Sequence, residues 1–131
     1  MITLTVNGGP PTFEVGFVED MNIQDALEAA FNASSDSKIL TFSLQFYGNS
    51  LGYLVNMVNE TYDSFIAPNS YQPFFYWEIL LNNTPITKGI DNTKLMDGDS
   101  VEFIYTRFVP EVHGNSTLAV KFKQKALSQS N

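Results

Sequence analysis

The side chains that could do chemistry in this chain are carboxylates and one histidine, because cysteine is absent. The carboxylates between Glu14 and Asp36 are scattered, and no two have a spacing that indicates a general acid paired with a general base. His113 has no serine or cysteine partner in a nucleophile motif. Asp91, Asp97 and Asp99 carry oxygen ligands that suit calcium, but their spacing does not fit the twelve-residue calcium loop and favours a turn. The sequence therefore predicts a protein that is not an enzyme, with no metal site and no required cofactor.

The densest aromatic group comprises Tyr71, Phe74, Phe75, Tyr76 and Trp77. Neighbouring residues of a strand point to opposite faces, so only about half of these rings can share one face. A sheet covered on both faces, or a subunit interface, would account for the group. A platform on which a flat ligand stacks is the alternative, and both explanations stay open.

Composition narrows the choice of partner. Fourteen acidic side chains against seven basic ones give a formal charge of −7, which repels nucleic acid and anionic membranes at long range. The longest apolar runs are too short to span a bilayer, so we expect no membrane insertion. N-glycosylation sequons favour a secreted or cell-surface location. They begin at Asn32, Asn59, Asn82 and Asn115.

The first part of the chain predicts a hairpin followed by a helix. Apolar residues alternate over residues 2–6 and again over 13–17, on either side of a Gly-Gly-Pro-Pro turn. Asn22 is the predicted N-cap of a helix that ends near residues 32–37, with Asp25 favourable in its first turn. One face of this helix is apolar. It carries Ile23, Ala26, Leu27, Ala30 and Phe31.

The second part predicts further strands. Residues 40–47 and 53–57 form a second hairpin around a turn at residues 48–52, and residues 59–73 form a long surface loop. The strand at residues 75–81 is apolar on both faces and therefore central. A turn at residues 82–85 follows it, a tight turn at residues 97–99 precedes a strand at residues 101–106, and a last strand occupies residues 118–122.

This order indicates an α+β fold of the β-grasp kind, in which one amphipathic helix packs on a mixed or antiparallel sheet. An all-β sandwich is the alternative. We expect a single domain over residues 1–122 and a flexible polar tail over residues 123–131.

Several short segments carry a resemblance to a known family. They are Val6-Asn7-Gly8, Asp25-Ala26-Leu27, Tyr47-Gly48-Asn49-Ser50-Leu51-Gly52-Tyr53-Leu54-Val55, Tyr76-Trp77-Glu78-Ile79-Leu80, Thr84-Pro85-Ile86-Thr87-Lys88-Gly89-Ile90 and Asp97-Gly98-Asp99-Ser100-Val101-Glu102-Phe103. In this order and with these gaps the chain resembles the C-terminal domain of transcobalamin and intrinsic factor, and stand-alone bacterial domains similar to it. The resemblance covers about residues 2–108.

In that family the domain closes over one face of cobalamin, which is held against a separate helical barrel. The resemblance therefore implies a ligand-facing turn and half of an enclosed site, with cobalamin as a ligand to consider. The loop at residues 59–73 departs from the family because it is longer and flanked by aromatic residues. The site residues that the resemblance and this loop indicate are Tyr47, Ser50, Leu51, Gly52, Tyr53, Tyr71 and Trp77.

Two functional hypotheses follow. The first is a non-catalytic module that binds a corrinoid, another flat hydrophobic ligand or a protein partner, using Ser50, Leu51, Tyr53 and Trp77 together with the loop at residues 62–74. The second is a secreted or cell-surface scaffold that forms homo-oligomers or packs against a neighbouring domain.

Overall fold

The computed structural model describes residues 1–35, 38–64 and 74–108. Its elements, in chain order, are β1 (Ile2–Val6), β2 (Thr12–Val15), α1 (Ile23–Asn32), β3 (Phe42–Phe46), β4 (Tyr53–Val58), β5 (Thr61–Tyr62), β6 (Phe74–Leu81), β7 (Thr84–Pro85), the 3-10 helix η1 (Ile90–Asn92) and β8 (Ser100–Phe108). This composition confirms the α+β class, and the all-β alternative is wrong.

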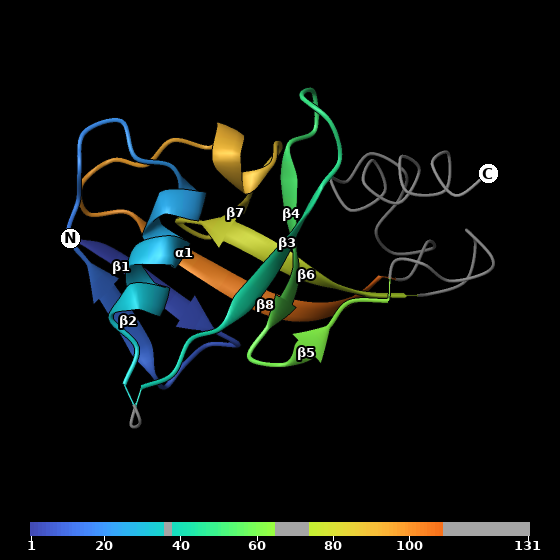
Figure 1. The fold of residues 1–131 in the computed structure, drawn as a ribbon, viewed down its shortest axis with the longest axis horizontal. Coiled ribbons are helices and arrows are strands. Elements are labelled where there is room, and N and C mark those ends of the chain that lie inside the picture. Colours follow the sequence, from blue (N-terminus) through green and yellow to red (C-terminus); the bar gives the residue numbers. More distant parts are fainter. Residues whose placement is uncertain (36–37, 65–73, 109–131) are drawn as a thin grey trace.

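The strands form two sheets. The larger sheet has the order β2-β1-β8-β6-β7, and the smaller sheet has the order β3-β4-β5. β1 and β8 run parallel, whereas every other pairing in both sheets is antiparallel. Figure 1 shows α1 and the smaller sheet side by side, both in front of the larger sheet. The result is one helix and one small sheet covering the same face of a mixed sheet.

Helix α1 begins where the sequence predicts. The Asn22 side chain accepts a hydrogen bond from the Asp25 amide at 2.8 Å, and the Asp25 carboxylate accepts one from the Asn22 amide at 3.0 Å. This reciprocal capping box satisfies donors that the first turn of a helix leaves unpaired. The predicted apolar face is buried except for Phe31, which is 50% exposed and touches Phe42 edge-on. Phe31 was expected on the buried face and instead lies at its margin.

The main core lies between α1 and the larger sheet. Its fully buried side chains include Ile2, Leu4, Ile23, Leu27, Ile90, Val101 and Phe103. Except for Ile90 of η1, each of these comes from a predicted apolar position on one face of its element, so burial follows the sequence pattern closely there.

A second, smaller core lies at the far end of β6 and β8. It consists of Tyr47, Leu54, Phe74, Tyr76 and Phe108. The Phe74 and Phe108 rings stack with centroids 4.7 Å apart. Phe74 and Tyr76 are thus buried in the smaller core and Trp77 in the main core, whereas Phe75 is 40% exposed and Tyr71 lies outside the described residues.

The remaining predictions compare with the structure as follows. Both hairpins and the turn at residues 97–99 are confirmed, and β6 lies inside the larger sheet as expected. The segment predicted as a loop from residue 59 contains the short strand β5, which pairs with β4. The strand predicted at residues 118–122 and the tail at residues 123–131 lie outside the described residues. Among the described residues, no helix is long and apolar enough to cross a membrane.

Candidate functional site

The turn between β3 and β4 stands clear of the larger sheet at the top of Figure 1. Two hydrogen bonds close it: the Tyr47 amide donates to the Gly52 carbonyl at 2.9 Å, and the Gly52 amide donates to the Gly48 carbonyl at 2.7 Å. Gly48 and Gly52 have φ values of +93° and +80°, a conformation that favours glycine. The turn is therefore a closed unit with a defined backbone path.

The strand ends at the base of this turn carry an aromatic pair. Phe46 and Tyr53 are opposite each other in the β3–β4 register, and their ring centroids are 4.8 Å apart. Phe46 is 43% exposed and Tyr53 is half-buried. Leu51 is half-buried beside the smaller core, and Ser50 is exposed at the tip. The turn thus presents the Phe46 ring, parts of Tyr53 and Leu51, and Ser50 to solvent.

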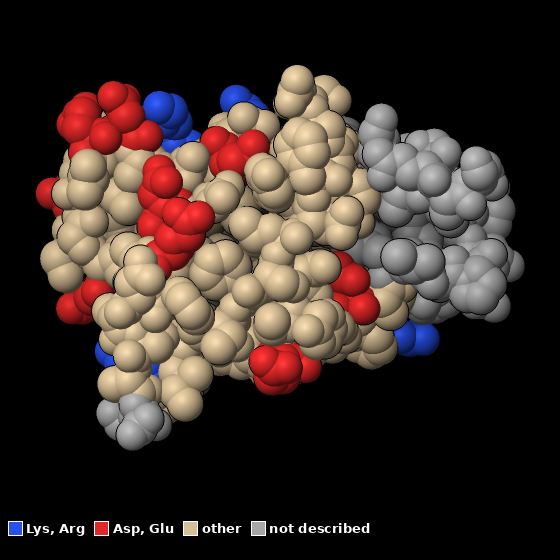
Figure 2. All heavy atoms as spheres, in the orientation of Figure 1, with Lys and Arg blue, Asp and Glu red and all other residues tan. Residues whose placement is uncertain are grey.

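No charged residue occurs between positions 46 and 53. Figure 2 shows the acidic side chains of this face in separate places, with uncharged atoms over the projecting turn. An uncharged surface with exposed rings can bury apolar ligand area without stripping water from an ion.

The turn is held from one side by the segment that contains η1. The Tyr53 amide donates to Asp91 Oδ1 at 2.8 Å, and the Gly89 amide donates to the Leu51 carbonyl at 2.9 Å. The approach is too close for a side chain: a Cβ on Gly52 would lie 2.3 Å from Asp91 Oδ1, and one on Gly89 would lie 2.5 Å from the Leu51 oxygen. These two glycines allow the backbone contact.

The η1 segment is fixed in turn by the start of α1. Asn22 Nδ2 donates to the Asp91 carbonyl at 3.0 Å, and the Ile23 amide donates to the Thr93 carbonyl at 3.2 Å. Thr93 Oγ1 also donates to the Gly89 carbonyl at 3.0 Å. A chain of hydrogen bonds therefore connects the N-cap of the helix to the projecting turn.

The structure brings four of the predicted site residues together, namely Ser50, Leu51, Gly52 and Tyr53. Tyr47 belongs to the same turn, but its side chain is buried in the smaller core with 6% exposure. Tyr71 lies outside the described residues.

Trp77 does not lie on the surface that the sequence suggested. It is 2% exposed within the main core, and its Nε1 donates to the Thr61 carbonyl at 3.0 Å. The smaller sheet covers this part of β6, so the Trp77 ring does not reach the surface, and the predicted ligand contact of Trp77 is wrong for this structure. Sequence reasoning missed Phe46, Gly89 and Asp91 as parts of the site.

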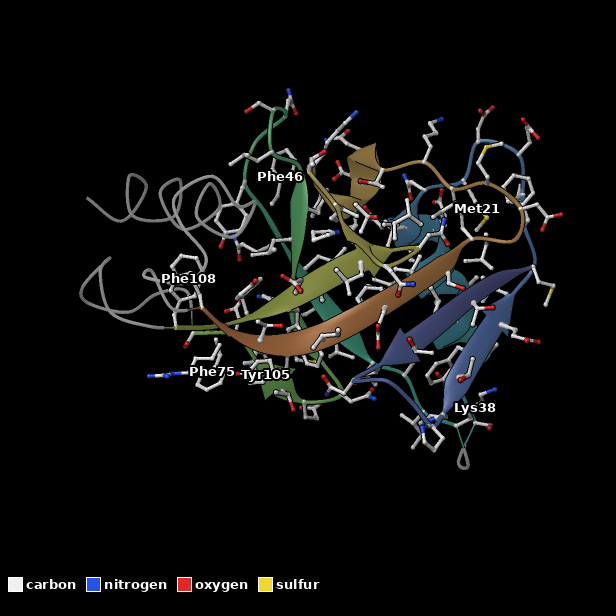
Figure 3. All side chains as sticks on the ribbon, turned by 180° about the vertical axis from the view of Figure 1, so that it is seen from behind. Met21, Lys38, Phe46, Phe75, Tyr105 and Phe108 are labelled. Atoms are coloured by element: carbon white, nitrogen blue, oxygen red, sulfur yellow. The ribbon has the colours of Figure 1, made fainter. Side chains whose placement is uncertain are left out.

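A second exposed aromatic group lies elsewhere. Phe75 and Tyr105 stack with centroids 5.1 Å apart and an interplanar angle of 9°, and the Tyr105 hydroxyl donates to the Tyr62 carbonyl at 2.6 Å. Figure 3 shows Phe46 and the Phe75–Tyr105 pair at opposite edges of the molecule. The surface predicted from Ser50, Leu51, Tyr53 and Trp77 with the loop at residues 62–74 includes residues 65–73, which lie outside the described residues.

The electrostatic environment affects three tyrosines. Burial raises the pKa of Tyr47 and of Tyr105 above its usual value, and the carboxylate of Asp63 raises both pKa values further. Burial and a 2.9 Å hydrogen bond to Glu78 raise the pKa of Tyr76 well above its usual value. All three phenols are therefore neutral near neutral pH. Within the described part of the chain, no three His, Asp or Glu side chains gather as metal ligands.

Comparison with known proteins supports the fold. No protein-family model and no curated protein matches the chain. Among solved structures, a putative metal binding protein from Ruminococcus gnavus ATCC 29149 aligns with a TM-score of 0.53 and 20% identity, over 82% of this chain and 96% of that one.

Haptocorrin in complex with Cbi aligns with a TM-score of 0.62 and 15% identity, over 82% of this chain. The alignment spans only 25% of the haptocorrin chain. Haptocorrin belongs to the transcobalamin family, so the fold is related to one found in that family. At these identities the likeness concerns the fold.

Proposed function

We propose that this chain is a non-catalytic binding module that holds a flat, apolar ligand against the turn between β3 and β4, and that corrinoids are the ligand class it accepts. The Phe46–Tyr53 pair at the base of a fixed, uncharged turn, with Phe46 exposed and Tyr53 half-buried, is the observation that carries the proposal. The related fold in haptocorrin, whose structure contains Cbi, supports the choice of ligand class.

The turn suits such a ligand in shape as well as chemistry. Aromatic rings stack on flat conjugated ligands, Leu51 adds aliphatic contact, and the Ser50 hydroxyl can bond to a ligand amide. Because the backbone is already fixed, binding need not order the turn, which lowers the entropic cost. The proposal requires no cofactor and no titratable pair.

The expected affinity is modest. One exposed ring and its neighbours bury far less area than an enclosed site, so we expect a Kd on the order of 100 µM for the isolated chain. A second protein surface that covered the opposite face of the ligand would raise the affinity by burying that face as well.

The test is a titration of the full chain with cobinamide, followed by amide chemical shifts of the 14.7 kDa protein. Shifts should concentrate at residues 46–53. Phe46→Ala should weaken binding at least fivefold, and Leu51→Asp should abolish it. The matched control is Phe31→Ala, because Phe31 is also an exposed ring in contact with another ring, yet lies on α1. Absence of any shift at residues 46–53 up to millimolar cobinamide would refute the proposal.

A scaffold that self-associates is the second candidate, and one observation favours it. Large apolar side chains are exposed on and near β3, which has no second strand partner among the described residues. They are Phe31, Ile39 and Phe46. Sedimentation of the full chain should then show a dimer that Ile39→Lys dissociates, and a monomer at all concentrations would eliminate this candidate.

A secreted or cell-surface location is part of the proposal, with the sequons as support. Asn32 is exposed at the end of α1, whereas the Asn82 side chain donates to Asp99 at 2.9 Å. In a secretory eukaryotic host we expect glycan at Asn32 and none at Asn82, as measured by peptide mass spectrometry. Glycan at Asn82 would contradict the observed hydrogen bonding.

A further inference from the structure

Asp91 connects two parts of the chain that are distant in sequence. Its carboxylate accepts the Tyr53 amide across a separation of 38 residues, and its own carbonyl accepts Asn22 Nδ2. No lysine or arginine forms an ion pair with Asp91 among the described residues. The carboxylate is therefore engaged with backbone, and its position is fixed by the start of α1.

The turn is held against the rest of the domain in two ways. The side chains of Tyr47 and Leu51 pack in the smaller core, and the bonds from Tyr47 and Gly52 that close the turn are internal to it. The hydrogen bonds that join the turn to the η1 segment, and so set its angle to that segment, are the bond from Tyr53 to Asp91 and the bond from Gly89 to Leu51. Of the two, only the first involves an ionised acceptor, and such bonds are roughly twice as strong as neutral ones.

We infer that Asp91 is the positioning residue of the β3–β4 turn: its carboxylate fixes the angle at which the Phe46–Tyr53 pair faces a ligand. Asp91 touches no part of the exposed ring surface itself and acts through the Tyr53 amide. This inference rests on the proposed function for its meaning in binding, but the position of the turn can be measured without any ligand.

The inference predicts a specific pattern of variants. In Asp91→Ala the hydrogen-bond acceptor for the Tyr53 amide is lost, so the turn leaves the η1 segment part of the time. Only molecules whose turn lies against the η1 segment bind ligand, so cobinamide should bind about tenfold more weakly. In Asp91→Asn the amide oxygen still accepts from Tyr53, so affinity should stay within about threefold of the parent.

Amide hydrogen exchange in the absence of ligand provides the decisive measurement. The informative amide is that of Gly89, because its bond to the Leu51 carbonyl does not involve the Asp91 side chain. In Asp91→Ala the Gly89 amide should exchange at least tenfold faster, whereas the Tyr47 amide, bonded inside the turn, should keep its rate. Amides of β6 serve as the reference for global stability.

The outcomes separate the two proposals. Fast Gly89 exchange in Asp91→Ala, restored in Asp91→Asn, supports the positioning role even if cobinamide binds neither protein; in that case the proposed function alone fails. Unchanged Gly89 exchange in Asp91→Ala overturns the inference, because the turn would stay docked without the carboxylate. Equal acceleration at Gly89, Tyr47 and β6 also overturns it, since the loss would then be global.

Discussion

Substituting Gly89 by alanine tests the contact between the turn and the η1 segment directly. Gly89 has φ −60° and ψ 162°, which alanine adopts without strain, so the added methyl acts only through its surroundings. That methyl would lie 2.5 Å from the Leu51 oxygen and 2.8 Å from the Tyr53 nitrogen. The turn must therefore move away.

The size of the effect follows from these distances. Ordinary contact begins at 3.4 Å, so the Leu51 carbonyl must retreat by about 0.9 Å, the difference between 3.4 and 2.5 Å. The 2.9 Å bond from Gly89 to Leu51 is then broken. The overpacking destabilises the fold by about 1–3 kcal/mol, and the lost hydrogen bond destabilises it by about 1 kcal/mol. Alanine also restricts the unfolded chain, which stabilises the fold by about 0.4–1 kcal/mol. We expect a net destabilisation of about 2 kcal/mol, or a Tm lower by about 6–10 °C.

The assay is thermal unfolding followed by the fluorescence of Trp77, the only tryptophan and a buried one. Gly16→Ala is the matched control: Gly16 is exposed, its φ lies outside the left-handed region, and an added Cβ meets nothing within 4 Å. Its Tm should change by less than about 2 °C. If the Tm of Gly89→Ala equals that of Gly16→Ala, the turn is not held against the η1 segment and the reasoning fails.

Three further predictions concern other parts of the molecule. Trp77→Phe should lower the free energy of unfolding in urea by about 2 kcal/mol, because it removes ring volume and the hydrogen bond to Thr61. An unchanged urea midpoint would contradict the placement of Trp77 in the core. Burial and Glu78 raise the folded-state pKa of Tyr76, so its neutral form contributes stability that is fully present below about pH 10 and is lost as the pH rises above that value. Tyr76→Phe should therefore flatten the decline in the free energy of unfolding above about pH 10. Asn83→Gly should raise the free energy of unfolding by about 0.5 kcal/mol, because Asn83 has φ +70° in a two-residue hairpin turn, and a lower midpoint would argue against that turn.

Local sequence patterns predicted the helix and strands well where an element depends on interactions between residues close in sequence. The Asn22 cap, the alternation in β1 and the glycines of the turns each depend on residues a few positions away. The order of hairpin, helix and further strands then leaves few arrangements, and the observed mixed sheet is one of them.

The exposure of Phe46 could not be predicted in the same way. The β3–β4 register shifts between Ser43 and Leu44, which pair with Met57 and Val55, so Asn56 is an extra residue that interrupts the alternation of β4. Phe46 lies exposed at the end of β3 beside Tyr53, where the larger sheet does not bury it. Nothing in the sequence marks where the register shift occurs or where the cover of β3 ends.

Contacts between residues distant in sequence were the other feature that the sequence did not predict. Asp91 was considered only as an oxygen ligand within a turn, because its bond to Tyr53 joins segments that no local pattern connects. Trp77 was placed on a surface by resemblance, whereas its burial depends on how the smaller sheet covers β6. Both depend on tertiary packing, which a single sequence does not display.

The parallel pairing of β1 with β8 has a consequence for how the chain folds. Thr3 pairs with Ser100, a separation of 97 residues, so the centre of the larger sheet closes only after nearly the whole described chain exists. Closing a loop of that length costs about 4 kcal/mol in chain entropy before any contact between the two strands stabilises the closed state. A ribosome adding about 5–20 residues per second leaves Leu4 and Val6 without their β8 partners for about 5–20 s. The domain therefore folds late in synthesis and slowly, with its first strand in need of protection until the last described strand arrives.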